Sequence, residues 1–168
     1  MKDYIQTRKY NYLFNGLVIM VLLGVTTITE AKGTDFSGTW ILNKEKSQLG
    51  ERGRVDASKV ITQKGDSLTI KRTFTGRDGQ EMSDVDKFLI NGKECINKGF
   101  RNSERKSVLN WDSDGKTLII KSTHTMERNG EKREMHITEK LLLSADGKLL
   151  TIKASSNRGE IKMVYDKK

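Results

Sequence analysis

The sequence contains no proline and only one cysteine, Cys95, among its 168 residues. Without a second cysteine the chain cannot form an internal disulfide, so a single hydrophobic core must stabilise the fold. A lone thiol can be reactive, although a buried structural cysteine is the commoner case. The absence of proline suits a sheet in which most backbone N–H groups are paired, because proline removes a ladder hydrogen bond.

Motifs for several kinds of chemistry are also missing from the sequence. It has no phosphate-binding loop and no dinucleotide glycine pattern. His124 and His136 are the only histidines and have no third ligand at a recognisable spacing, so we predict no metal site and no cofactor. Ser122 lies two residues from His124 without a nucleophile elbow or an orienting acid, so we predict no catalytic residue. We expect the carboxylate pair Asp84 and Asp86 to lie at an outward or rim position.

Basic residues outnumber acidic ones, with 31 Lys and Arg against 22 Asp and Glu and a formal net charge of +9. Such a charge can attract nucleic acid, an anionic membrane or an acidic polysaccharide. The charges are interspersed rather than gathered into a block, which favours a solvated surface of mixed sign. Nucleic-acid binding also needs exposed aromatic side chains among the basic ones. Most aromatics here fall on candidate core faces, so we predict no nucleic-acid partner.

The N-terminal segment has the order of a secretory signal. Basic residues are followed by the apolar run Leu13–Val25, and small and polar residues continue to Ala31. We therefore predict a signal peptide over 1–31 and one secreted or periplasmic domain over 32–168. The run is shorter than the roughly 20 apolar residues of a membrane span, and it contains Asn15. The alternative is an uncleaved signal that anchors the protein to the membrane.

Turn signals divide the rest of the chain into short segments. Asn-Gly and Asp-Gly pairs supply the positive φ angles of tight hairpins, and their regular spacing indicates consecutive antiparallel strands. No segment after residue 31 has a convincing helical period. The stretch 94–104 is less regular, and we expect a long loop with a short strand there. The other predicted strands lie near 37–43, 58–64, 67–75, 80–90, 105–111, 116–127, 132–143, 148–155 and 160–166.

Alternation within these segments indicates a half-buried sheet. Leu68, Ile70 and Phe74 share one face of their strand, whereas Lys71 and the threonines beside it share the other. The lysine-bearing faces must point to water, unlike the outward apolar band of an outer-membrane barrel. About eight or nine such strands close most easily into an all-β, up-and-down antiparallel barrel, which leaves no exposed edge. A β-sandwich is the alternative, but it usually needs crossing connections.

The segment "DFSGTWILNKEKS" (35–47) resembles the opening strand of the calycin superfamily, which includes the lipocalins and fatty-acid-binding proteins. It is more similar still to bacterial secreted lipocalin-like domains that open with Phe-Ser-Gly-Thr-Trp. Segments 60–73, 109–125 and 137–152 resemble the later hairpins of that group in order and spacing. Gly38 would let the backbone pass close to its neighbours at the narrow barrel end, which Trp40 would plug.

The chain departs from these families in three places. Segment 43–58 is too short for the two lid helices of fatty-acid-binding proteins. Those proteins often end with Arg-x-Tyr, which holds a carboxylate, whereas this chain has Met163-x-Tyr165. The C-terminal helix that follows a lipocalin barrel is absent from the predicted pattern. The resemblance therefore implies a calycin-like barrel more strongly than it implies a lipid carrier.

Several polar residues share the apolar, inward faces of the predicted strands: Arg72, Ser122, His124, Glu139 and Tyr165. Since a buried charge is costly unless it is paired, we expect Arg72 and Glu139 to meet each other or a ligand. An apolar wall with a few convergent polar groups is typical of a binding pocket, and also of a filled small barrel.

From the resemblance, we predict an exported, non-catalytic barrel that binds a small apolar or amphipathic ligand in its lumen. The alternative is a filled-barrel interaction or scaffold protein whose basic surface meets an acidic partner. An enzyme is a third possibility, since some calycin-type barrels catalyse isomerisation. It would need an acid within hydrogen-bond reach of His124. The binding hypothesis requires a cavity, open at one end, that reaches the five candidate residues.

Overall fold

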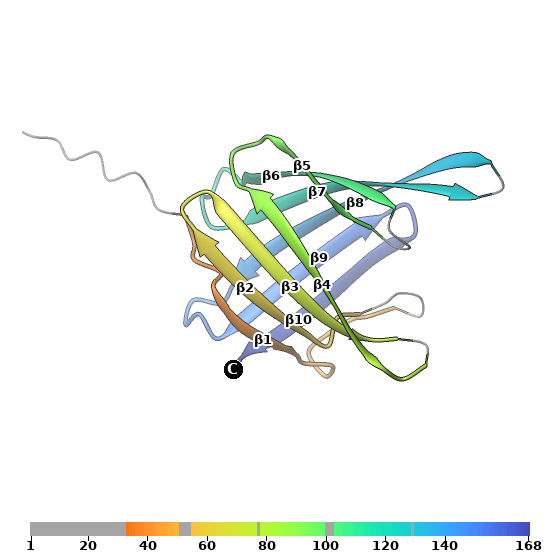
Figure 1. Cartoon of the computed structure of the whole chain (residues 1–168). Coiled ribbons are helices and arrows are strands. Elements are labelled where there is room, and N and C mark those ends of the chain that lie inside the picture. Colours follow the sequence, from red (N-terminus) through yellow and green to blue (C-terminus); the bar gives the residue numbers. More distant parts are fainter. Residues whose placement is uncertain (1–32, 51–54, 77, 100–102, 129) are drawn as a thin grey trace, which may run out of the picture. The chain divides into compact units, whose positions relative to one another are not determined.

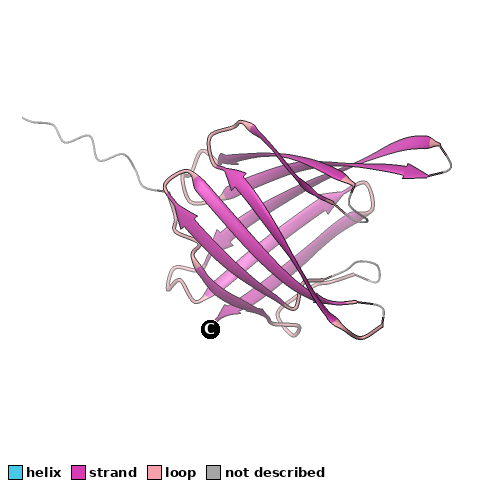
Figure 2. Ribbon diagram, viewed as in Figure 1, coloured by secondary structure: helices cyan, strands magenta, loops and turns pink. Residues whose placement is uncertain are grey.

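A computed structural model describes residues 33–50, 55–76, 78–99, 103–128 and 130–168, so the predicted signal segment lies outside the described residues. Regular structure in these ranges is entirely strand (Figure 2). No helix within them is long and apolar enough to cross a membrane. The strands are β1 (Gly38–Leu42), β2 (Ser58–Lys64), β3 (Ser67–Thr75), β4 (Glu81–Leu89), β5 (Glu94–Lys98), β6 (Glu104–Trp111), β7 (Leu118–Arg128), β8 (Glu131–Leu143), β9 (Leu149–Ser156) and β10 (Gly159–Lys167).

These strands form one antiparallel sheet in the order β4-β3-β2-β1-β10-β9-β8-β7-β6-β5 (Figure 1). All sequence neighbours pair except β4 and β5, and β1 pairs with β10, so the first and last strands lie side by side. The predicted all-β, up-and-down barrel is confirmed, and the sandwich alternative is wrong. The predicted number of eight or nine strands is too low, because the short strand expected in 94–104 is present as β5 and joins the sheet.

The edges of β4 and β5 are joined by side chains instead of a backbone ladder. The Lys87 N–H donates to Asn97 Oδ1 over 2.8 Å, and Asn97 Nδ2 donates back to the Lys87 carbonyl over 2.9 Å. The Leu89 N–H donates to Cys95 Sγ over 3.2 Å. The Asn97 amide thus takes the place of a peptide unit, and the barrel is nearly closed. Cys95 is half-buried and belongs to this seam.

The apolar core is built around Trp40 and Phe36, both fully buried. The Trp40 indole N–H donates to the Phe36 carbonyl over 3.0 Å, and the Phe36 ring stacks on Trp111 with 6.0 Å between ring centres. Gly38 has a φ of +150°, which side chains on L-residues rarely permit. A Cβ there would also lie 2.9 Å from Cε of Lys167. Gly38 thereby leaves room for Lys167 of β10, whose Nζ lies 5.2 Å from the centre of the Trp40 ring.

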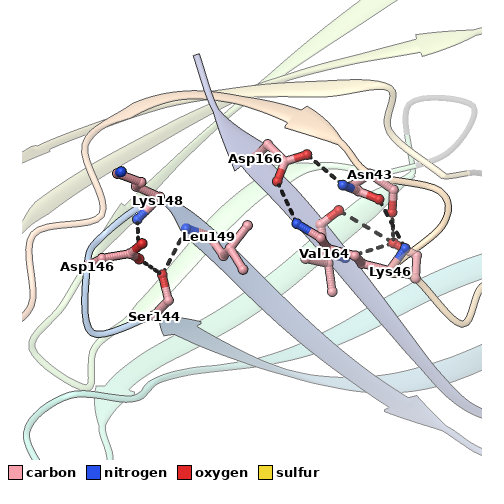
Figure 3. Close-up of polar contacts among 9 residues, drawn as sticks. Asn43, Lys46, Ser144, Asp146, Lys148, Leu149, Val164 and Asp166 are labelled. Carbon is pink, nitrogen blue, oxygen red and sulfur yellow. Dashed lines mark hydrogen bonds and ion pairs between the residues drawn. The ribbon is translucent and has the colours of Figure 1, made fainter.

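Polar contacts fasten the segment that follows β1 to the outer side of β10 (Figure 3). Asn43 Nδ2 donates to Asp166 Oδ2 over 2.7 Å, and the Val164 N–H donates to Ser47 Oγ over 2.9 Å. In the nearby turn between β8 and β9, the Ser144 hydroxyl donates to Asp146. This bond lowers the pKa of the Asp146 carboxyl. The described part of 43–57 therefore forms turns and a bridge to β10.

Candidate functional site

Strand alternation carries charged residues into the lumen. Arg72 follows Ile70 on the inner face of β3, Asp86 precedes Phe88 on β4, and Arg105 precedes Leu109 on β6. Asp86 and Arg105 are only 3% and 6% exposed. Burying a charged group costs free energy unless the group is paired, so each of these side chains needs a partner in the lumen.

The Asp86 carboxylate pairs with both guanidinium groups. Arg72 Nη2 lies 2.6 Å from Asp86 Oδ2, and Arg105 Nη2 pairs with Asp86 Oδ1. Burial lowers the pKa of Arg105, and the nearby Asp86 carboxylate opposes that shift. The Nε atoms of both arginines are buried without a hydrogen-bond partner. Both Nε–H donors are therefore buried polar groups without an acceptor within the described protein.

A second buried pair lies beside the first, because Lys59 on β2 is directly opposite Arg72 on β3. Lys59 Nζ is 2.5 Å from Asp56 Oδ2 and 5.4 Å from the centre of the Tyr165 ring. The Tyr165 hydroxyl donates to Met163 Sδ over 3.6 Å. Burial raises the pKa of Tyr165, and the Asp56 and Glu139 carboxylates raise it further. Tyr165 is therefore a protonated phenol inside the core.

The lumen contains two separate spaces. The inner one is a void of about 20 Å³ beside the Arg72–Asp86–Arg105 cluster, with room for a single water but not for a ligand. The outer one is a cavity of about 400 Å³, here called the mouth cavity. Arg72 and Arg105 line both spaces and so form the floor of the mouth cavity. Its wall has the apolar residues Met135, Ile137, Ala154 and Ile161 and the charged residues Asp84, Lys98 and Arg158.

His124 also lines the mouth cavity. Burial, together with the positive charges of Arg105 and Arg72, lowers its pKa from 6.5 to about 4. The imidazole is therefore neutral at pH 7. His136 is exposed on the opposite face, where Thr123 Oγ1 lies 3.1 Å from its Nδ1. The two histidines do not meet, and no group of three or more metal-ligating side chains exists among the described residues.

The mouth cavity reaches two of the five predicted lumen residues, Arg72 and His124. Ser122 and Glu139 line the inner void, and the Ser122 hydroxyl shares a 2.8 Å hydrogen bond with Ser107. Tyr165 lies within the core and is fully buried. The expected contact between Arg72 and Glu139 is replaced by the pair of Arg72 with Asp86, while Glu139 acts on Arg105 through space.

One buried residue was placed wrongly from the sequence, and two others were not identified. Asp86 was expected at an outward or rim position, yet it is the buried centre of the cluster. Arg105 and Lys59 were not identified, although both are buried in the lumen. Each shares its strand face with a buried apolar residue. Phe88 lies two positions after Asp86, Ile61 two positions after Lys59, and Leu109 four positions after Arg105. Because side chains an even number of positions apart point to the same face of a strand, this spacing is the signal that would have identified the three residues as inward.

Comparisons with known proteins find the fold but no family. No protein-family model and no curated protein matches the sequence. A solved structure described as the REP1-NXSQ fatty acid transporter is similar with a TM-score of 0.56 and 16% identity, over 80% of this chain and 96% of that one. The N57A mutant of the fluorescent protein UnaG is similar with a TM-score of 0.56 and 18% identity, over 79% and 96%. These two similarities show the fold alone, which in the described residues is a ten-stranded, up-and-down antiparallel barrel that is nearly closed.

Proposed function

We propose that the mouth cavity binds a small amphipathic molecule whose polar end carries a hydrogen-bond acceptor. The observation that carries this proposal is the cavity's construction. A wall of apolar residues, with Asp84, Lys98 and Arg158 among them, rises from a floor of two arginines. Arg72 and Arg105 each have a buried Nε–H donor without a hydrogen-bond partner. A cavity of about 400 Å³ lies within the usual range for small-molecule sites. The structural similarity to a fatty acid transporter supports the same class of ligand.

Asp86 limits what the head group can be. It already pairs with each guanidinium, and both Nε–H donors are buried, so a ligand reaches these donors only once the arginine side chains move. A carboxylate, sulfonate or carbonyl oxygen satisfies such donors, and a purely apolar molecule leaves them unpaired. The neutral His124 ring adds a further polar contact without adding charge.

The proposed role is binding and not catalysis. General acid–base chemistry at His124 needs a proton partner within hydrogen-bond reach. No carboxylate among the described residues hydrogen-bonds to His124, and the charges that face it are the two arginines. A depressed pKa near 4 also leaves the imidazole a weak base at neutral pH.

The test is a titration with an amphipathic fluorophore, 8-anilinonaphthalene-1-sulfonate, followed by displacement with decanoate. Ala154→Phe fills the mouth cavity from β9 and should abolish binding. Thr151→Phe adds the same ring to the opposite face of the same strand and should bind like the wild type. Arg72→Lys keeps a cation beside Asp86 but removes the Nε donor, so affinity should fall about tenfold. Equal binding by all four proteins would exclude the mouth cavity as the site.

We also propose that the protein is an exported lipocalin-like domain whose residues 1–31 are removed. The order of basic, apolar and small residues in that segment supports this proposal. N-terminal sequencing of the protein purified from its own host should give Lys32 as the first residue. A mature chain that still begins at Met1 would exclude cleavage.

A further inference from the structure

Three lysines stand in one row across the outer face of neighbouring strands. Lys140 on β8 lies directly opposite Lys153 on β9, and Lys153 lies directly opposite Lys162 on β10. Gln48 extends the row, because it forms a backbone bridge with Lys162. Adjacent strands are about 4.8 Å apart, so the row presents ammonium groups at short, regular intervals across the strands.

The three lysines repel one another, and no carboxylate among the described residues pairs with them. Like charges directly opposite each other destabilise a pair of strands. None of the three lysines has a salt-bridge partner among the described residues. Elsewhere on the outer face, Lys121 lies opposite Thr138 and Lys106 lies opposite Thr123. An anion bound along the row would remove the repulsion.

The row also lines a hollow of about 450 Å³, bounded by Gln48 on one side and by Ser155 and Glu160 on another. Gln48 and Ser155 supply neutral hydrogen-bonding groups beside the ammonium groups. Glu160 lies opposite Ser155, one row away from the lysines. Its carboxylate repels an anion on that side and so favours an anionic ligand that follows the lysine row.

We propose that this lysine row binds an acidic polysaccharide, a chain with one carboxylate or sulfate on each sugar. The spacing of neighbouring strands is close to the length of one sugar ring, so successive anions can meet successive lysines. Lysine ammonium groups are compact, hydrated charges, which suits a flexible and hydroxylated polyanion better than a planar one. The lysine row lies on the outer face, and its hollow shares Ala154, Ser155 and Ile161 with the mouth cavity but not the arginine floor.

Two other polyanionic partners fit the hollow less well. Binding of single-stranded nucleic acid relies on aromatic side chains that stack on bases, and no residue lining the hollow is aromatic. A membrane surface is usually met by exposed apolar side chains as well as by basic ones. The exposed large apolar residues lie on β1, β2, β4 and β5 or beside them, outside the hollow.

The test measures the fluorescence anisotropy of a labelled oligogalacturonate titrated with the full chain at low salt. Replacing the three lysines together, Lys140→Gln, Lys153→Gln and Lys162→Gln, should weaken binding at least about tenfold. It should also flatten the dependence of affinity on salt concentration. The triple variant should keep the circular dichroism spectrum and the 8-anilinonaphthalene-1-sulfonate binding of the wild type, because the substitutions are on the outer face.

A control variant makes the same change in net charge elsewhere. Lys64→Gln, Lys71→Gln and Lys87→Gln alter exposed lysines of β2, β3 and β4, and should leave the affinity within twofold of the wild type. Equal losses in both triple variants would overturn the proposal, because net charge alone would explain them. Tighter binding of duplex DNA or of phosphatidylglycerol vesicles through the same three lysines would overturn the choice of polysaccharide. No measurable binding of the oligogalacturonate to the wild type would overturn it as well.

Discussion

Asp86→Asn should destabilise the protein strongly. Among the ion pairs described above, no other substitution of a carboxylate by an amide should cost as much. The amide keeps the size of the side chain but removes the charge that faces two guanidinium groups. Breaking a buried pair costs about 3–5 kcal/mol because a charge is left without compensation. Arg72 is 20% exposed at its side chain and Glu139 still acts on Arg105. We therefore expect about 3 kcal/mol, near the lower end of that range.

Urea unfolding monitored by tryptophan fluorescence measures this loss, and about 3 kcal/mol lowers the midpoint by about 1.5 M. Asp166→Asn is the matched control, since Asp166 pairs with Lys46 at 3.4 Å and both side chains are about half exposed. It should cost less than about 1 kcal/mol. Adding Arg105→Met to the Asp86→Asn variant should restore part of the stability by removing an unpaired cation. If Asp86→Asn costs no more than the control, or if the second change lowers stability further, the account of the cluster is wrong.

Three further predictions concern His124, Asn97 and Trp40. The pKa of His124 near 4 lies below its unfolded value of 6.5, so the unfolded chain binds more protons and stability should fall between pH 6.5 and 4. The full shift corresponds to about 3 kcal/mol, and we expect roughly half because the site is only half-buried. His124→Gln should flatten the wild-type curve of unfolding free energy against pH across this window, whereas His136→Gln should not, and equal curves for the wild type and both variants would contradict the assignment. Asn97→Ala should speed hydrogen exchange at the Lys87 amide, and unchanged exchange would mean that the seam does not depend on Asn97. Trp40→Ala should cost about 3–5 kcal/mol in urea unfolding, and a loss below 1 kcal/mol would contradict its place in the core.

Strand positions could be predicted where apolar and polar residues alternate. In β3, Leu68, Ile70 and Phe74 point inward and are buried, as the pattern indicates. β5 could not be predicted in the same way because its inward residues are Cys95 and Asn97, which are polar and close the seam to β4. A strand whose inner face makes hydrogen bonds gives no apolar period to read.

The charged cluster was only partly predictable for a similar reason. Parity places Arg72, Asp86 and Arg105 on inner faces, but only the spatial neighbours of each strand decide which charges meet. Arg72 pairs with Asp86 from the adjacent strand β4, whereas Glu139 on β8 belongs to another part of the sheet. The mouth cavity and the lysine row depend on sheet register in the same way, and a one-residue shift would turn each side chain to the other face.

Native mass spectrometry of the protein purified from its own host tests the central claim most directly. The account predicts one small molecule retained per chain in the wild type and in Thr151→Phe, and none in Ala154→Phe. The retained mass should correspond to an amphipathic compound with an acidic or carbonyl head group. A wild-type protein that carries no molecule and also binds neither decanoate nor 8-anilinonaphthalene-1-sulfonate would contradict the claim, as would a molecule that Ala154→Phe retains equally well.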